Sequence, residues 1–286
     1  MPGDGTRSVL ITGCSTGIGR ATALHLASRG FAVYATARRP ETLEELGRAG
    51  CRTLRLDVTD EVSMQAALDA VERDGGIVDV LVNNAGYGLE GPIEELSLDK
   101  IRAQFETNLF GPTRLTQMVL PAMRERRRGR IINISSVGGR ITTPGTGAYH
   151  ASKHALEALS DALRFELRGF GVDVVVVEPG AIKSRWVDTA VRGLEDRIQP
   201  SGPYAKFNRA VVKQMYGAHE GLLGLAAGPP EAVARVIERA ITATRPRRRY
   251  PVPAAAQLLI GLHHWLPSSV WDAFMRRMYP SPGVDD

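Results

Sequence analysis

Near its N-terminus the chain reads Val9-Leu10-Ile11-Thr12-Gly13-Cys14-Ser15-Thr16-Gly17-Ile18-Gly19-Arg20-Ala21-Thr22-Ala23-Leu24. A short apolar, β-branched run leads into a glycine-rich turn, and the turn leads into an amphipathic helical pattern. A strand, a glycine turn and a helix in this order point backbone N–H groups and a helix N-terminus at a phosphate group. The spacing is G-x-x-x-G-x-G rather than G-x-G-x-x-G, and an ordinary glycine turn before a helix would fit the same residues. The stretch predicts the first βα unit of a dinucleotide-binding fold, and the rest of the chain decides between these interpretations.

Strand and helix patterns alternate along the remaining chain. Runs rich in apolar and β-branched residues predict strands at 7–12, 31–36, 52–56, 78–83, 130–135, 172–178 and 248–252. The helical patterns between them indicate βαβ units. We therefore expect an α/β fold, a three-layer, Rossmann-like, doubly wound parallel sheet of about seven strands. One domain is expected over 1–252, followed by a C-terminal helical extension over 253–286.

Tyr149 and Lys153 lie four residues apart in a segment that fits a helix. This spacing puts both side chains on one helical face. A free tyrosine has a pKa of about 10, and a neighbouring ammonium group favours the phenolate. The pair therefore predicts a tyrosine whose pKa is lowered for proton transfer, although chance alone produces this spacing often.

Further motifs follow at separated positions. They are Asp57 after the third predicted strand, Asn83-Asn84-Ala85-Gly86 after the fourth, Thr107-Asn108-Leu109, Ser136, the Tyr149–Lys153 pair and Pro179-Gly180 after the sixth. With the glycine turn at 12–19, this set resembles the short-chain dehydrogenase/reductase family in its single-domain branch. The resemblance covers Val9 to about Pro251. The Ala-Thr-Ala-Arg strand end at 35–38 and the long C-terminal extension look like the steroid and retinol dehydrogenase-like members.

The resemblance implies hydride transfer between a nicotinamide and a carbonyl or alcohol, with Asn108, Ser136, Tyr149 and Lys153 as catalytic residues. Tyr149 would donate a proton in reduction or accept one in oxidation. Lys153 would lower the pKa of Tyr149 and hold the nicotinamide ribose. Ser136 would bind the substrate oxygen, and Asn108 would hold a water that links Lys153 to solvent. Ser135 fits the serine position by composition, but the family register favours Ser136.

The cofactor prediction rests on Tyr34-Ala35-Thr36-Ala37-Arg38-Arg39 at the end of the second predicted strand. An NAD-specific site places here a carboxylate, which would repel a ribose 2′-phosphate, whereas a guanidinium group binds that phosphate. Ala37 takes the carboxylate's position, so we expect NADP(H), with Arg38 as the main ligand and Arg39 as a second. The alternative is that both arginines only solvate the strand end. The resemblance adds the cofactor-binding positions Gly13, Ser15, Thr16, Gly17, Ile18, Gly19, Asp57, Val58, Asn84, Ala85, Gly86, Pro179, Gly180, Ile182 and Ser184, together with Tyr149 and Lys153.

The segment 181–228 is expected to form the lid over the substrate. Beside Ser136 and Tyr149, we select Trp186, Phe207 and Met215 as candidate substrate-binding residues. An apolar stripe at helical spacing, to which the last two belong, also fits ordinary core packing. As a lid, it favours a bulky hydrophobic alcohol or ketone, such as a steroid, a retinoid or a lipid-derived carbonyl. His219 would meet a distal polar group of such a ligand, or else lie in solvent.

The C-terminal extension carries two short amphipathic patterns with aromatic anchors, at 254–266 and 270–279. One interpretation is a weak peripheral contact with a membrane, and the other is packing against the lid or a dimer partner. The net charge of +5 comes with arginine clusters at 124–130 and 245–249. These clusters lie at expected helix ends and lack aromatic interleaving, so we expect no nucleic-acid partner.

The two cysteines, Cys14 and Cys51, give no disulfide framework. Together with the lack of a secretory pattern, they lead us to expect a cytoplasmic protein. No metal-binding motif is apparent, and no metal is expected.

Two classes of function remain open. The first is an NADP(H)-dependent oxidoreductase, with a 3-ketoacyl-thioester reductase as the competitor within that class. The second is a non-catalytic NADP(H)-binding regulatory or scaffold protein, which would not need all four catalytic positions. The resemblance also implies a homodimer or homotetramer formed through the long helices expected at about 99–126 and 147–169.

Overall fold

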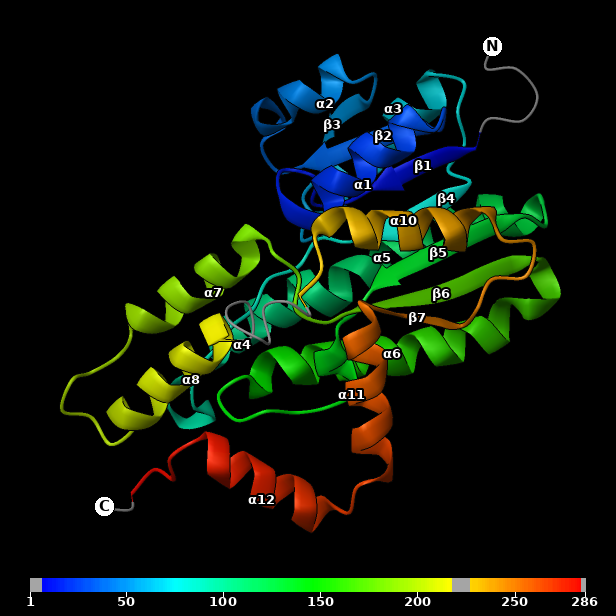
Figure 1. Cartoon of the computed structure of the whole chain (residues 1–286). Helices are drawn as coiled ribbons and strands as arrows, with labels where there is room; N and C mark the ends of the chain where they lie inside the picture. Colours follow the sequence, from blue (N-terminus) through cyan, green and yellow to red (C-terminus); the bar gives the residue numbers. More distant parts are fainter. Residues whose placement is uncertain (1–6, 218–226, 284–286) are drawn as a thin grey trace.

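A computed structural model describes residues 7–217 and 227–283. One parallel sheet of seven strands crosses the molecule (Figure 1). The strands are β1 (Ser8–Ile11), β2 (Ala32–Ala37), β3 (Arg52–Arg55), β4 (Val80–Asn83), β5 (Gly129–Ile134), β6 (Val172–Pro179) and β7 (Arg249–Val252). Their order is β3-β2-β1-β4-β5-β6-β7, so the chain winds first to one side of β1 and then to the other. This reversal opens a crevice at the carboxyl ends of β1 and β4, where ligands bind in such sheets.

Helices cover both faces of the sheet, because successive strand residues point to opposite faces and both faces are apolar. Val9 and Ile11 face one core, while Leu10 faces the other. The first core is covered by α1 (Gly17–Ser28), α2 (Glu44–Arg48) and α10 (Pro230–Thr242). The second is covered by α3 (Glu61–Arg73), α5 (Gly111–Glu125) and α6 (Gly147–Leu167). The three-layer, doubly wound fold is confirmed.

All seven predicted strands are present, each within two residues of its expected ends. The helix expected at about 99–126 consists of α4 (Leu98–Phe105), a π-helical turn η3 (Glu106–Phe110) and α5. Short 3-10 turns complete the connections, namely η1 (Pro40–Leu43), η2 (Ile93–Glu95), η4 (Val137–Gly139) and η5 (Arg168–Phe170).

Four helices lie beyond the carboxyl edge of the sheet: α7 (Arg185–Glu195), α8 (Ala205–Gly217), α11 (Ala254–Trp265) and α12 (Ser268–Met278) (Figure 1). The segment 181–228, which is expected to form the lid, starts and ends at one place, because Gly228 donates to the carbonyl oxygen of Ala181 at 3.0 Å and accepts from Lys183 at 2.9 Å. Ala256 of α11 packs with Val137 and Ile141, which lie just after β5. Across residues 7–217 and 227–283, none of the helices has the length and apolar character to span a membrane.

Candidate active site

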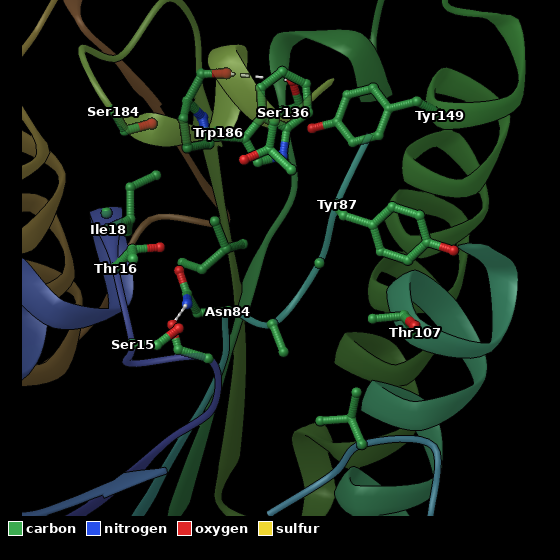
Figure 2. Close-up of a pocket in the computed structure, with 18 of the residues that line it drawn as sticks. Ser15, Thr16, Ile18, Asn84, Tyr87, Thr107, Ser136, Tyr149, Ser184 and Trp186 are labelled. Atoms are coloured by element: carbon green, nitrogen blue, oxygen red, sulfur yellow. Dashed lines mark hydrogen bonds between the residues drawn. The ribbon is translucent and has the colours of Figure 1, made fainter. Parts of the chain in front are cut away.

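A cleft of about 880 Å³, here called the central cleft, lies at the carboxyl ends of the strands. Figure 2 shows Ser15, Thr16 and Ile18 on one wall, with Tyr87 and Thr107 on the opposite wall. Most of the candidate residues line it: Gly13, Ser15, Thr16, Gly17, Ile18, Arg38, Asp57, Val58, Asn84, Ala85, Gly86, Ser136, Tyr149, Lys153, Pro179, Gly180, Ile182, Ser184 and Trp186. Five candidates are not among its lining residues: Gly19, Arg39, Asn108, Phe207 and Met215.

The glycine turn is shaped by close backbone approaches. Gly13 has φ +72°, and a Cβ atom there would lie 2.9 Å from the Cα atom of Ala85. A side chain at Gly19 would collide with the carbonyl oxygen of Gly13 and with the amide of Asn84. Thr16 caps α1 without a side-chain hydrogen bond, and the first turn of the helix carries no acidic residue. The helix therefore presents to the cleft an N-terminus without a side-chain cap or an acidic side chain, which favours an anion.

Thr12 and Asn84 join the turns after β1 and β4. The Thr12 hydroxyl accepts hydrogen bonds at 3.0 Å from the backbone N–H groups of Asn84 and Ala85. In return, the Asn84 amide donates to the carbonyl oxygens of Thr12, at 2.8 Å, and Gly13, at 3.1 Å. These bonds hold the floor of the cleft rigid where the two strands diverge.

Arg38 and Arg39 differ in their position relative to the central cleft. Arg38 lines the cleft at the end of β2 and is exposed, and its guanidinium makes no hydrogen bond or ion pair within residues 7–217 and 227–283. Arg39 lies outside the cleft, at the start of η1. Asp57 faces the cleft after β3, and its carboxylate accepts from the Thr59 N–H at 3.0 Å and the Thr59 hydroxyl at 2.8 Å. Of the two arginines, Arg38 is therefore the one free to bind an anion in the cleft.

Tyr149 and Ser136 lie at the inner end of the cleft, near Trp186 (Figure 2). Ser136 follows β5, and its hydroxyl accepts from the Gly138 N–H at 3.0 Å. The hydroxyl of Ser136 also donates to the Pro179 carbonyl oxygen at 3.5 Å, and Tyr149, which is 8% exposed on α6, lies near it. The indole of Trp186 packs against the tyrosine ring with 5.1 Å between centroids. The neighbouring Ser135 is buried and also lines the cleft.

Lys153 lies one helical turn after Tyr149 on the same face of α6, as its spacing predicts. Its ammonium group donates to the carbonyl oxygen of Ile134 at 2.9 Å and lies 5.9 Å from the centre of the Tyr149 ring. Burial lowers the pKa of Lys153 to about 8, and the Coulombic effect of Glu157 opposes this.

The predicted lowering of the tyrosine pKa is not what the chain itself produces. Burial raises the pKa of Tyr149 above its ordinary value. The Ser136 hydroxyl opposes this rise, and the Glu90 carboxyl adds to it. The correction has a physical cause, since the Lys153 ammonium is held by Ile134 while desolvation penalises the phenolate. In the protein alone, Tyr149 therefore carries its proton at neutral pH.

Asn108 lies in the π-helical turn η3 and is fully engaged with its neighbours. Its amide donates to the Tyr87 carbonyl oxygen at 2.9 Å and to Ser152 at 3.1 Å, while its oxygen accepts from the Tyr87 N–H at 3.0 Å. A Cβ atom at Gly86 would lie 3.0 Å from this oxygen and 3.6 Å from the Lys153 ammonium. The Asn108 side chain thus shapes the turn beside Lys153.

The lid candidates divide between two places. Trp186 lines the central cleft, whereas Phe207 and Met215 pack on α8 with Leu194, Val211 and Tyr279. Phe207 also lines a second cavity of about 1020 Å³, here called the outer cavity, between the 140–147 loop and helices α11 and α12. Phe207 and Met215 therefore pack as core residues, which is one of the two interpretations of the apolar stripe in the sequence. His219 lies outside the described residues.

Several lining residues were not predicted, among them Tyr87, Glu106 and Thr107. Tyr87 directly follows the Asn83–Gly86 turn and Thr107 directly precedes Asn108, so adjacency to a motif is the signal that could have found them. Glu90, which does not line the cleft, was not predicted either. It is 1% exposed, in a segment that is otherwise glycine, leucine and proline.

The thiols of Cys14 and Cys51 are free and buried. Burial raises the pKa of Cys14 to about 12 and that of Cys51 to about 11, so neither is an activated nucleophile. No group of three metal-ligating side chains is found in the parts of the chain that the structure describes.

Comparison with known proteins gives consistent matches. The family model for short chain dehydrogenases matches residues 7–194. The uncharacterized oxidoreductase YbbO of Escherichia coli (strain K12) is 38% identical over 272 residues, covering 94% of each chain. Human retinol dehydrogenase 5 is 37% identical over 288 residues, covering 96% of this chain and 89% of the relative. A variant of actinorhodin polyketide ketoreductase solved with NADPH superposes with a TM-score of 0.73 at 31% identity, covering 86% of this chain and 95% of that one.

Proposed function

We propose that this chain, which belongs to the short-chain dehydrogenase/reductase family, is an NADP(H)-dependent oxidoreductase that interconverts a bulky hydrophobic ketone and its secondary alcohol. The observation that carries the proposal is the convergence of Ser136, Tyr149 and Lys153 at the inner end of a cleft whose other end is the glycine turn. A binding module would not need this set of side chains, whereas carbonyl reduction uses each of them.

The residues present fit a dinucleotide. The uncapped N-terminus of α1 suits the pyrophosphate, and Gly13 and Gly19 leave room for the backbone to approach it. The free guanidinium of Arg38, with Ala37 in place of a carboxylate, suits a ribose 2′-phosphate and supports NADP(H). The related ketoreductase structure was solved with NADPH, which also supports NADP(H) as the cofactor. When bound, the cofactor supplies or accepts the hydride.

The proton is handled by the chain. In reduction, the Tyr149 hydroxyl donates its proton to the carbonyl oxygen as the carbonyl carbon gains a hydride, so that an alcohol and a tyrosinate form. Ser136 stabilises the negative charge that develops on the same oxygen. Lys153 stabilises the tyrosinate electrostatically, and a proton from solvent then restores the phenol. Because burial keeps Tyr149 protonated, the reductive direction begins from the correct protonation state.

The substrate class is supported by the walls around Tyr149. Trp186 and Val187 line the cleft beside the catalytic residues, and both present apolar surface. The related enzyme named retinol dehydrogenase acts, by its name, on an apolar alcohol. We infer a bulky, hydrophobic carbonyl compound, such as a steroid, retinoid or lipid derivative, rather than a small polar one.

We also propose a homodimer or homotetramer. The exposed apolar side chains Phe110, Leu159 and Phe165 lie on η3 and α6, among the helices expected to mediate assembly. A second apolar face lies on α11 and α12, where Leu258, Leu262, Trp265, Val270 and Phe274 are exposed. This face supports a weak peripheral membrane contact. The bond from Trp271 to the Thr142 carbonyl oxygen and the packing of Tyr279 on Phe207 support the alternative that the extension packs on its own domain.

NADPH oxidation by the purified protein tests the proposal, with steroid, retinoid, aliphatic and ketoacyl-thioester carbonyls as substrates and Tyr149→Phe as the comparison. We expect turnover of an apolar ketone that falls at least about 100-fold in the variant, the usual size of a general-acid contribution. NADPH binding should change by less than about threefold. Turnover of the thioesters alone would favour the ketoacyl-thioester alternative, which the polyketide ketoreductase neighbour keeps open. NADPH binding without any turnover would favour a non-catalytic role.

A further inference from the structure

Glu90 is a buried carboxyl group that the mechanism above does not use. It is 1% exposed, and neither of its oxygens has a hydrogen-bond partner in the described part of the chain. Buried polar groups in proteins are paired as a rule, because desolvation without a partner is costly. An unpaired buried carboxyl beside a catalytic tyrosine therefore requires a reason.

The backbone holds Glu90 in this position. The N–H of Gly91 donates to the Gly145 carbonyl oxygen at 2.7 Å, and the Arg197 guanidinium donates to the carbonyl oxygen of Glu90 itself. Arg197 thus binds the backbone of Glu90, and the two carboxyl oxygens stay without a hydrogen-bond partner. Because both neighbours of the residue, Leu89 and Gly91, are buried as well, the fold directs this side chain inward.

Glu90 does not line the central cleft itself, but it lies next to Trp186, which lines the cleft beside Tyr149. An ideal Cβ atom on Gly88 would lie 2.5 Å from the Glu90 Oε1 atom and 2.7 Å from the Trp186 ring, so these two groups are neighbours. The same Trp186 ring packs on Tyr149. The Glu90 carboxyl also acts electrostatically on Tyr149. A substrate whose carbonyl reaches Tyr149 and Ser136 meets the Trp186 ring, and displacement of that ring would open the cleft to Glu90.

We propose that Glu90 is a substrate-binding residue, whose carboxyl binds a hydrogen-bond donor, a hydroxyl or an ammonium group, that the substrate carries close to its reacting carbonyl. The proposal rests on the proposed function and narrows the substrate to apolar ketones with one such polar group. A hydroxyl would pair with the protonated carboxyl, and an ammonium would pair with the carboxylate. In either case the Glu90 oxygens, which are unpaired within the described residues, gain their partner from the substrate.

The test compares three stable probes in the oxidative direction with NADP⁺: a long-chain secondary alcohol, its vicinal diol and its vicinal amino alcohol. The enzymes are the wild type, Glu90→Leu, Glu90→Gln, and Glu125→Gln as a control that removes an exposed carboxyl at the far end of α5. In the wild type, the diol or the amino alcohol should exceed the plain alcohol about 10- to 100-fold in kcat/KM, as expected for one buried hydrogen bond. Glu90→Leu should bring this ratio to about one, and Glu125→Gln should leave it unchanged.

The Glu90→Gln variant shows whether the substrate group that binds Glu90 is a hydroxyl or an ammonium group. An amide still pairs with a hydroxyl but cannot neutralise an ammonium group, so the variant should retain a diol preference and lose an amino-alcohol preference. A wild type without any preference, or a preference that persists in Glu90→Leu, would overturn the proposal while leaving the oxidoreductase function intact.

Calorimetry separates this inference from the proposed function. If no probe is oxidised, the oxidoreductase proposal loses its support, but binding of the same three compounds to the NADP⁺-loaded protein still decides the role of Glu90. Binding of the diol or amino alcohol that disappears in Glu90→Leu would support it. Proton release on binding the amino alcohol, seen as a heat that depends on the buffer and absent in Glu90→Gln, would show the carboxyl ionising. Equal binding by the wild type and Glu90→Leu, or no binding by either, would refute the inference.

Discussion

Replacing Glu90 by leucine should stabilise the free protein, and the gain should depend on pH. Burial raises the pKa of Glu90 from its ordinary value of 4.5 to about 8, with Arg197 opposing the rise. Between these two values the folded protein keeps a proton that the unfolded chain has released. Stability therefore falls as pH rises through this window, by about 1.4 kcal/mol per pH unit. Below pH 4.5 both states hold the proton and this cost is absent.

The expected loss of stability follows from the difference between the two pKa values of Glu90, 4.5 and about 8. At pH 7 the cost reaches about 3 kcal/mol, and at pH 8 about 4 kcal/mol. Leucine removes the ionisable group and has a similar volume with an apolar surface. The free energy of unfolding of Glu90→Leu should therefore exceed that of the wild type by about these amounts. In a domain of this size, 3 kcal/mol corresponds to a rise in Tm of roughly 6–12 °C.

Equilibrium urea unfolding of the cofactor-free proteins at pH 5, 7 and 8 measures the difference. Glu90→Gln should lose the same pH dependence with a smaller gain in stability, because its buried amide still lacks partners. Glu125→Gln should follow the wild type at each pH. A Glu90→Leu protein that is less stable than the wild type, or a difference that does not grow with pH, would show that the carboxyl is paired in the folded state, and the reasoning would be refuted.

Two further predictions concern the cofactor and the extension. Arg38→Asp should raise the KM for NADPH about 10- to 100-fold and leave that for NADH much less affected, because it removes one charge-assisted bond to the 2′-phosphate. Arg39→Asp, which lies outside the cleft, is the matched control, and equal effects of the two variants would argue against Arg38 as the ligand. Deletion of 254–286 should lower the free energy of unfolding by about 2–4 kcal/mol, because it uncovers the apolar contacts of Ala256 and Met275. Unchanged unfolding in urea would mean that the extension does not stabilise the domain.

The sequence was sufficient for those features that depend on local conformation and on pattern. The seven strands could be predicted because a parallel sheet buried on both faces requires continuous apolar runs. Gly13 and Gly19 could be selected because their spacing after a strand is that of a phosphate turn, and the structure shows the close approaches that forbid side chains there. The meeting of Ser136, Tyr149 and Lys153 follows from one strand end and one helical spacing.

The tertiary structure decided which side chains face the cleft and how strongly each group is desolvated. Helical periodicity alone does not say whether an apolar stripe faces a ligand or another helix, and Phe207 and Met215 pack with Leu194 and Tyr279. The pKa of Tyr149 could not be predicted from its spacing to Lys153, because burial outweighs a cation that is held by Ile134. Glu90 carries no motif at all. The carboxyl group is isolated because Trp186 and Arg197, which lie far from Glu90 in the chain, pack against the 88–91 segment. Only this assembly in three dimensions removes water from the carboxyl group.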